Sequence, residues 1–491
     1  MIGLGFEIEN SFNFRDRIKK HMTLETHLFF LENRTQITLD LIAKINRENP
    51  DARLIVVDVS SFNYPRLGPW LVPGFLGSRS NKVSAMFYAL GVEYVDGAKV
   101  QPTQQAVFTT EESRMMGTAI RSTIMSGYAR GIRKRTRPPL IEVCLNRHLT
   151  SQSQKVFSLA TDLIRELSAT RVFVANERFA AQHATYLAAR REGAKILFYA
   201  VSSTVDRGFL VEDYKGHDRI KMQSRALEAT SMLRDSELKN YSSDLLARIK
   251  GNNSFDSLWT KSKNAWRGPR DSLALFATSS SDETYSLDLG WNEASWDDQY
   301  GAFEAIWGRL KLRDFNPVLR IHPNLLNKSP SAARREIKQI RRFESENPEF
   351  YIVWPASPVT TYDLISYSDV VVVENSTVGL EASAAGIPVI CSNSCEYDII
   401  ADVVTVHGPE DLDKIDRMSK TSDPRGAQRY CAYSEIIRGY VPQNEFGVAL
   451  SNSSIFKLLI PSLIDGSIFS GVFELRWKIY RFIMLKTSPR R

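Results

Sequence analysis

Three side chains at the start of a predicted helix have the chemistry to bind a nucleotide. They lie in residues 369–391, DVVVVENSTVGLEASAAGIPVIC, where a buried β-branched strand is followed by a short polar turn. Ser376 and Thr377 are good N-cap residues, and the free N–H groups and dipole at such a helix start bind phosphate. Glu381, one turn further on, can accept hydrogen bonds from a ribose diol. The alternative is structural: the hydroxyls cap the helix, and Glu381 complements its first turn.

A histidine at the end of an earlier apolar strand is the second candidate. His322 follows the run at 317–321, and Pro323 stiffens the turn that leaves the strand. An imidazole at the mouth of a sheet can donate a hydrogen bond to a phosphate oxygen. The alternative is a histidine held by partners within the fold. Only one strand–helix repeat separates His322 from Ser376, so we expect the two residues to follow neighbouring strands.

Two further polar turns extend this predicted ligand site. Ser279 and Ser280 follow the first strand of the same region, where hydroxyls suit a second phosphate contact or simply a solvated turn. Glu374 and Asn375 come directly before the phosphate turn. A carboxylate there either repels a phosphate or positions the ribose through a hydrogen bond.

Regular alternation of strands and helices must position these side chains. When helices connect consecutive strands, the strands run parallel and the turns that follow them all lie at the carboxyl edge of the sheet. Ligands of such sheets bind at this edge. In the second half of the chain we predict strands at 273–278, 317–321, 350–354, 369–373, 387–391 and 403–406, with helices at 300–312, 331–344, 361–367 and 378–385.

The first half of the chain has the same organisation in a less regular form. Its patterns predict strands at 53–60, 172–175 and 195–200 and helices at 35–49 and 180–192. The polar stretch at 250–270 has the composition of a linker. We therefore predict an acceptor-side Rossmann-like domain at 1–262, a donor-binding Rossmann-like domain at 271–445, and C-terminal helices at 446–491 that pack back on the first domain.

These motifs together resemble those of capsule polysaccharide biosynthesis proteins and related bacterial GT-B glycosyltransferases. The group includes Kdo transferases, polysialyltransferases and glycerophosphate polymerases. The resemblance rests on His322-Pro323, on STVGLEA at 376–382 and on GIPV at 386–389. It covers residues 273–391 well and the first half of the chain only in its layout. It implies an α/β fold of the GT-B type, with two Rossmann-like domains facing across a cleft.

The resemblance also implies roles for individual residues. In the family the His-Pro histidine and the serine turn contact the donor's phosphate, so His322, Pro323, Ser376 and Thr377 are expected to do so here, with Glu381 on the ribose. The group mostly uses cytidine-linked donors, which implies a CMP- or CDP-linked sugar. The acceptor would be a surface or capsular polysaccharide or its lipid-linked precursor.

Glycosyl transfer needs a proton acceptor near the attacking hydroxyl, and the GT-B layout places it in the first domain. Glu177, at the end of a predicted strand, is the leading candidate, followed by Asp58 and Glu32. Each is otherwise an ordinary surface or capping acid. Asn176 and Arg178 are candidates for binding an acidic acceptor. No clear Asp-x-Asp metal signature accompanies these motifs, so we expect metal independence and no other cofactor.

Composition narrows the setting in which the protein works. The 491 residues are 43% hydrophobic and 24% charged, as in globular enzymes, and the net charge of +7 suits anionic ligands without favouring nucleic acid. Four cysteines are too few for a disulfide framework. With neither a signal peptide nor a long apolar run, we expect a cytoplasmic protein. A basic, amphipathic segment at 473–491 either contacts the inner membrane peripherally or packs on the first domain.

Two rival functions stay open at this point. A nucleotide-sugar 2-epimerase has the same fold, but it would carry an Arg-rich, Glu-containing loop after the last strand. The corresponding segment SNSCEY at 392–397 contains Glu396 and no arginine. The other rival is a non-catalytic, nucleotide-binding component of a polysaccharide assembly complex.

Overall fold

The fold is known from a computed structural model, and the described residues fall into several ranges. These are 25–31, 35–59, 62, 87, 90–127, 140–201, 207–212, 217–251, 266–269, 271–279, 291, 293–323, 325, 330–434 and 441–442. Glu32, Ser280 and the predicted C-terminal helices at 446–491 lie outside these residues. Among the described helices, none has the length and apolarity needed to cross a lipid bilayer.

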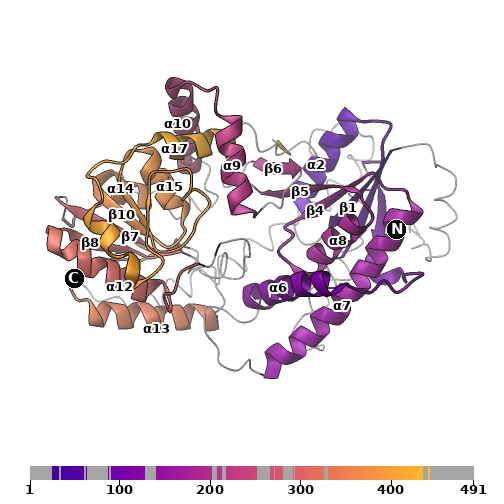
Figure 1. Ribbon diagram of the computed structural model, residues 1–491, viewed down its shortest axis with the longest axis horizontal. Coiled ribbons are helices and arrows are strands. Elements are labelled where there is room, and N and C mark those ends of the chain that lie inside the picture. The colour runs from indigo at the N-terminus through magenta and orange to yellow at the C-terminus, as the bar shows by residue number, and fades with distance from the viewer. Residues whose placement is uncertain are drawn as a thin grey trace, which may run out of the picture.

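The chain forms two α/β domains, each built around its own sheet (Figure 1). The first sheet has the order β13-β6-β5-β4-β1-β2-β3. Its strand pairs are parallel except that β6 runs antiparallel to both of its neighbours, β5 and β13. Its strands are β1 (Thr26–Leu31), β2 (Arg53–Asp58), β3 (Glu93–Asp96), β4 (Arg171–Ala175), β5 (Lys195–Val201), β6 (Arg207–Glu212) and β13 (Val441–Pro442).

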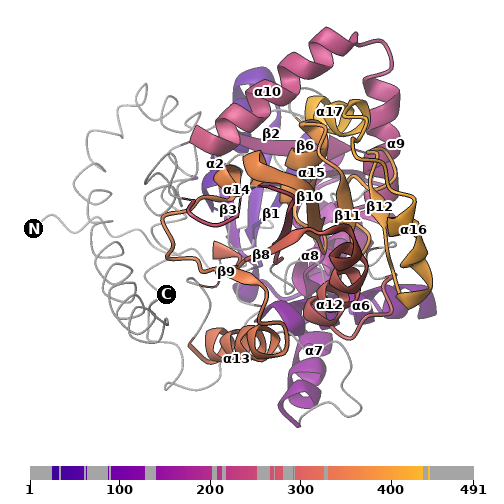
Figure 2. The ribbon, with the colours of Figure 1, turned by 90° about the vertical axis from the view of Figure 1, so that its left-hand side faces the viewer.

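The second sheet is parallel throughout and has the order β12-β11-β10-β7-β8-β9 (Figure 2). Its strands are β7 (Leu273–Ala277), β8 (Asn316–Arg320), β9 (Tyr351–Val353), β10 (Ser368–Val373), β11 (Val389–Cys391) and β12 (Val404–Thr405). The predicted α/β class with two parallel-sheet domains is confirmed.

Both sheets reverse their strand order once, and this reversal defines where a ligand would bind. In the second sheet β7, β8 and β9 run outward to one side, and β10, β11 and β12 run outward to the other. The first sheet reverses in the same way between β1 and β4. A crevice forms at the carboxyl ends of the two strands that flank such a reversal.

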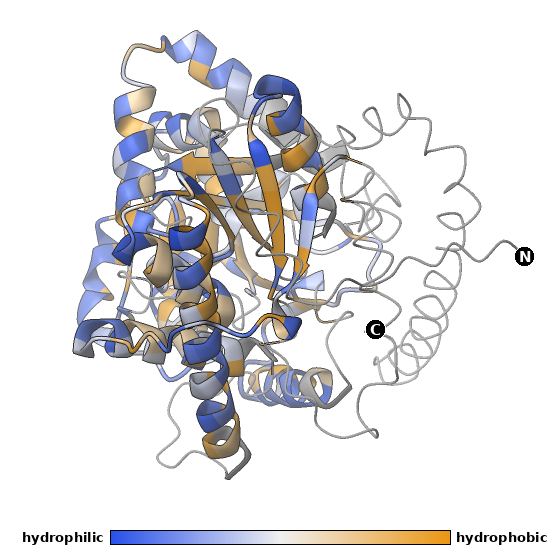
Figure 3. Ribbon diagram, turned by 90° about the vertical axis from the view of Figure 1, so that its right-hand side faces the viewer, coloured by the Kyte–Doolittle hydropathy of each residue, from blue (hydrophilic) through white to orange (hydrophobic). Residues whose placement is uncertain are grey.

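Strict alternation of buried side chains explains how each sheet carries helices on both faces. In β1, Leu28 and Phe30 face one core cluster, while Phe29 and Leu31 face another. The first cluster is completed by α6 (Thr110–Gly127), α7 (Leu140–Glu166) and α8 (Ala180–Arg191), and the second by α2 (Thr35–Glu48). Figure 3 shows the strands of this sheet as predominantly hydrophobic. Such two-sided burial is typical of parallel strands.

The second sheet is covered in the same two-layered way. Leu275 of β7 packs with Leu380 and Tyr430 on one face, while Phe276 packs with Phe303 and Ile340 on the other. The covering helices are α12 (Gln299–Leu310), α13 (Pro330–Glu346), α14 (Thr361–Tyr367), α15 (Thr377–Ala384), α16 (Asp413–Asp416) and α17 (Arg425–Ala432).

Two helices that precede the predicted linker pack on the second domain. α9 (Arg219–Ala229) contributes Ala226 to the core beneath α15 and α17. α10 (Asp235–Gly251) lies beside α17 in both ribbon views (Figures 1 and 2). Between the two helices, the Thr230 carbonyl accepts a hydrogen bond from Arg429 Nη1 at 2.6 Å. The first domain is therefore joined to the second through α9.

Candidate functional site

The strand reversal of the second sheet brings two predicted site residues into contact. The Asn375 N–H, just after β10, donates to Ser279 Oγ, just after β7, at 3.4 Å. Ser279 is itself held by Gln299 of α12, which accepts from its N–H at 2.9 Å and donates to its carbonyl at 3.3 Å. The two polar turns therefore meet at the point where a doubly wound sheet binds ligands.

The turn that follows β10 is fixed by a helix cap. Ser376 is the N-cap of α15, as predicted, and its hydroxyl accepts from the Val378 N–H at 3.3 Å. Its carbonyl accepts a hydrogen bond from the Tyr397 hydroxyl at 2.6 Å. Thr377, at the first position of the helix, is exposed. The helix start is thus held by its cap and by Tyr397, with the exposed Thr377 beside it.

His322 stands at the same carboxyl edge, but one strand further away than expected. Its N–H donates to Thr278 Oγ1 at 2.7 Å, and both His322 and Pro323 are half-buried. The prediction that His322 and Ser376 follow neighbouring strands is wrong, because β7 lies between β8 and β10. In a doubly wound sheet the fourth strand of the chain pairs with the first. Two strand spacings amount to about 10 Å, so the three turns form a row suited to an extended ligand.

Two predicted carboxylates of this site are buried within the domain. Glu374 is 2% exposed and lies near Tyr300 of α12, whose pKa is raised mainly by burial and further by Glu336, Asp298 and Glu374. Glu381 is 7% exposed and faces α17. There, the burial of Cys431 and the negative charge of Glu381 raise the pKa of Cys431 to about 12. Contact of either carboxylate with a ribose stays a prediction.

The predicted acceptor-side residues lie at the strand reversal of the first sheet. Asn176 and Glu177 follow β4 directly, and both are buried. Asn176 has a φ of 55°, a left-handed conformation that turns the chain sharply out of the strand. The Arg178 guanidinium lies over the Phe179 ring at 4.8 Å. All three candidates therefore lie beside β1, where a ligand of this sheet would bind.

Glu177 has a partner that the sequence did not reveal. Its Oε1 accepts from the His217 N–H at 3.2 Å and lies 3.2 Å from His217 Nδ1. Burial alone would raise the pKa of Glu177, but the charge and the donors of His217 outweigh it and lower the pKa to about 2. His217 directly precedes Asp218, the N-cap of α9, so the place where α9 docks brings it to Glu177.

Asp58, the second candidate base, lies in a different part of the same edge. It ends β2, which is separated from β4 by β1. Its Oδ2 accepts a hydrogen bond from the Tyr94 hydroxyl at 2.7 Å. Asp58 and Glu177 therefore do not form a pair of acids on adjacent strands.

The segment that holds His217 also reaches the second domain. The His217 carbonyl accepts from Trp291 Nε1 at 2.7 Å, and Trp291 follows β7 in the chain. Arg219 forms an ion pair with Asp398, which follows β11, and each side chain is 6% exposed. Glu293, also after β7, lies 3.7 Å from Arg219. Chain that leaves the carboxyl edge of the second sheet thus contacts the predicted acceptor-side cluster.

Comparison with known proteins identifies distant structural likenesses only. No family model matches the chain, and no curated protein matches it in sequence. KpsC of Thermosulfurimonas dismutans, a beta Kdo 2,4 transferase, is 13% identical over 55% of this chain and 80% of that one, with a TM-score of 0.37.

Two other solved structures extend over more of the chain. The UDP-GlcNAc 2-epimerase of Methanocaldococcus jannaschii, solved with UDP-GlcNAc and UDP, is 10% identical over 83% of this chain and 98% of that one, with a TM-score of 0.33. A glycosyltransferase from Rickettsia africae is 12% identical over 89% and 99%, with a TM-score of 0.31. Likeness at this level does not distinguish transfer from epimerisation.

Proposed function

We propose that the protein is a GT-B glycosyltransferase that moves a sugar from a nucleotide-activated donor, CMP- or CDP-linked, to a surface or capsular polysaccharide or its lipid-linked precursor. The observation that carries the proposal is the contact between Ser279 and Asn375 across the strand reversal of the second sheet. The contact joins the turns after β7 and β10, and the turn after β8 that carries His322 follows the neighbouring strand. Such a row of turns suits the phosphate and sugar of a nucleotide donor.

In this proposal the donor lies along the second domain. His322, Ser279 and the start of α15 bind its phosphate, and the buried Glu381 supports the ribose side. The acceptor lies along the first domain, beside Asn176 and Arg178. We expect the transfer to need no metal ion or other cofactor, and domain closure to exclude water from the reacting atoms.

A nucleotide screen tests the donor side directly. Thermal unfolding of the full chain is measured with CMP, CDP, UDP and GDP, and we expect cytidine nucleotides to raise Tm most. A ligand at one hundred times its Kd stabilises the folded state by about 2.7 kcal/mol. Stabilisation by none of the four would refute nucleotide binding, and the strongest shift from another base would revise the donor.

Site variants connect this binding to the row of turns. We expect Ser279→Ala and His322→Ala each to weaken nucleotide binding about 10- to 100-fold, the value of one hydrogen bond to a charged group. Lys338→Ala, at an exposed position of α13, is the matched control and should bind normally. Affinity unchanged in both site variants, measured by calorimetry, would remove the proposed site.

Turnover assays separate the rival functions. A glycosyltransferase forms product only when an acceptor glycan is added. Conversion of the nucleotide sugar without any acceptor would identify a 2-epimerase. Nucleotide binding with no conversion of either kind would identify a non-catalytic component.

A further inference from the structure

A buried carboxylate and a half-buried histidine form a pair at the carboxyl edge of the first sheet. Glu177 Oε1 lies 3.2 Å from His217 Nδ1, and the two side chains are 4% and 24% exposed. The same oxygen accepts from the His217 N–H, so the histidine is held at two points. A carboxylate that accepts from Nδ1–H fixes the imidazole in one tautomer and leaves the lone pair on Nε2.

His217 lies where the chain passes from the first domain to the second. The residue directly precedes α9, and its carbonyl is fixed by Trp291 from the β7–α12 connection. Two residues later, Arg219 pairs with Asp398 from the segment after β11. Both partners lie in connections that leave the second sheet at its carboxyl edge. His217 is therefore anchored between the edges where donor and acceptor would meet.

Glu177 itself is poorly suited to accept a proton. Although burial disfavours its charge, the donors around it keep its pKa near 2, far below the pH of catalysis. A general base works best when its pKa is near the working pH, which is the ordinary range of imidazole. The carboxylate is better suited to orient the histidine and to stabilise the imidazolium that forms.

Several other titratable or charged groups surround the pair among the described residues. His183 of α8 places Nδ1 at 2.9 Å from the Glu177 carbonyl, and Tyr186 of the same helix is close enough to interact with the Glu177 charge. The remaining groups are Arg178 on the loop after β4, Asp218 and Arg219 at the start of α9, and Glu293 before α12. Among the described residues, Glu177 is the group that contacts His217 Nδ1.

We propose that His217 is the general base of the transfer and that Glu177 is its positioning residue, a proposal that rests on the proposed function. The acceptor hydroxyl gives its proton to His217 Nε2 while its oxygen forms the bond to the anomeric carbon. The bond from that carbon to the donor's phosphate oxygen breaks, and its electron pair stays on the leaving phosphate. Neutral imidazole becomes imidazolium beside the Glu177 carboxylate, so charge and atoms balance.

Steady-state kinetics on the full chain tests the chemical role. With a sugar donor and acceptor that wild type turns over, we expect His217→Gln to lower kcat by about 100- to 10,000-fold with the donor KM unchanged. Glu177→Gln should lower kcat with the donor KM unchanged, because the imidazole is no longer held in the tautomer that leaves the Nε2 lone pair free. Lys221→Ala, exposed on α9, should match wild type.

The same assay contains the results that would overturn the proposal. Wild-type kcat in His217→Gln would overturn the base while leaving the glycosyltransferase proposal intact. Loss of kcat in Asp58→Asn with kcat kept in His217→Gln would assign the base to Asp58. Absence of turnover in wild type with every nucleotide sugar would overturn the proposed function, and the role of His217 with it.

A measurement that needs no substrate tests the pair itself. Nitrogen NMR of histidine-labelled full chain, with the His217 signal assigned by its loss in His217→Gln, reports the tautomer. We expect the neutral ring to carry its proton on Nδ1 in wild type and to lose this preference in Glu177→Gln. A proton on Nε2 in wild type, or a tautomer unaffected by the substitution, would overturn the positioning role of Glu177.

Discussion

At Glu177, burial and a neighbouring histidine act on one carboxyl group in opposite directions. Burial disfavours the carboxylate, whereas the charge and two donors of His217 favour it, and the balance lowers the pKa from 4.5 to about 2. The native fold thus binds a proton at this position less readily than the unfolded chain does. Glu177 therefore contributes stability that depends on pH.

The sign of that contribution gives a test at the residue scale. Because the folded pKa is depressed, the stabilisation is present above pH 4.5 and is lost as the pH falls toward 2. The difference between the two pKa values corresponds to roughly 3 kcal/mol. In urea unfolding we expect Glu177→Gln to be less stable than wild type at pH 6, with a smaller gap at pH 3. Glu228→Gln, exposed on α9, should change stability by less than about 1 kcal/mol. A gap independent of pH would contradict the ionised state of Glu177.

At the scale of elements, the start of α15 depends on one residue without a side chain. A Cβ on Gly379 would overlap the Tyr397 hydroxyl and lie 2.9 Å from Val373 Cγ2. The glycine lets the Tyr397 ring pass against the helix and donate to the Ser376 carbonyl. Three elements, β10, α15 and the segment after β11, are therefore locked together at the predicted phosphate turn.

Substituting alanine at two helical glycines distinguishes the effect of this close contact on stability from the effect of helix propensity. We expect Gly379→Ala to destabilise the fold by about 1–3 kcal/mol, because Tyr397 must move. Gly308→Ala, on the exposed face of α12 with nothing within 4 Å of the new Cβ, should stabilise by about 0.5–1 kcal/mol. Denaturant midpoints measure both. If Gly379→Ala is as stable as Gly308→Ala, Tyr397 does not constrain the helix start.

At the scale of the whole molecule, α9, which follows the first domain's strand β6 in the chain, is bound to the second domain by a buried glutamine. Gln223 is 0% exposed, and its Oε1 accepts from the N–H groups of Ile399 at 2.6 Å and Ile400 at 3.0 Å. Its Nε2 donates to the Cys395 carbonyl at 3.3 Å and to Asp398 at 3.0 Å. A single side chain thus satisfies four polar groups of the second domain.

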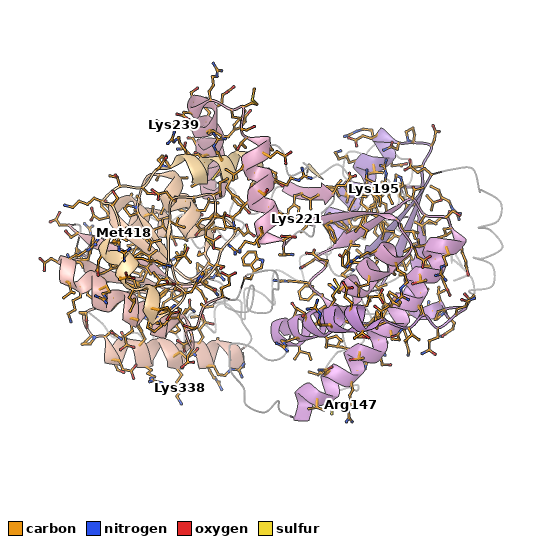
Figure 4. The ribbon with its side chains drawn as sticks, in the orientation of Figure 1. Arg147, Lys195, Lys221, Lys239, Lys338 and Met418 are labelled. Atoms are coloured by element: carbon orange, nitrogen blue, oxygen red, sulfur yellow. The ribbon has the colours of Figure 1, made fainter. Side chains whose placement is uncertain are left out.

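Removing that amide should loosen the segment after β11. Gln223→Leu removes the acceptor of the Ile399 N–H, whereas the Ile400 N–H keeps the Tyr397 carbonyl at 3.2 Å as a second acceptor. A donor left without a partner costs about 1–3 kcal/mol. We expect faster hydrogen exchange at the Ile399 amide and a lower midpoint of unfolding. Lys221→Ala, on the exposed side of the same helix, is the control; Lys221 is labelled in Figure 4. Unchanged exchange in Gln223→Leu would show that α9 is held by other contacts.

Sequence patterns predicted the six strands of the second sheet and helices α12 to α15 to within a few residues, whereas α16 and α17 were not predicted. The domain's strands are buried on both faces and its helices have distinct turn residues, so short apolar runs such as 369–373 were clear. β1 was missed although it is central to the first sheet. Four consecutive apolar residues, Leu28 to Leu31, show no period of two and resemble a buried helical turn as much as a strand. Strand β6 was missed as well, because its antiparallel pairing depends on its neighbours β5 and β13 and not on its own residues.

The sequence predicted which residues of the candidate site follow strands, but it did not predict which residues they contact. Ser279, Ser376 and Glu177 were identified because polar residues directly follow apolar strands. The order of the strands, which puts β7 between β8 and β10, is a property of the assembled sheet. The approach of His217 to Glu177, 40 positions apart in the chain, depends on where α9 docks. No local pattern encodes such contacts.

The short strand β13 has a consequence for biosynthesis. Val441 and Pro442 pair with Gly208 and Arg207 of β6, so the outermost strand of the first sheet comes from chain beyond the entire second domain. A ribosome therefore releases every residue of the second sheet before it supplies this last piece of the first. Until then β6 has no partner on its outer side. The first domain therefore completes its sheet only after the second domain has been synthesised.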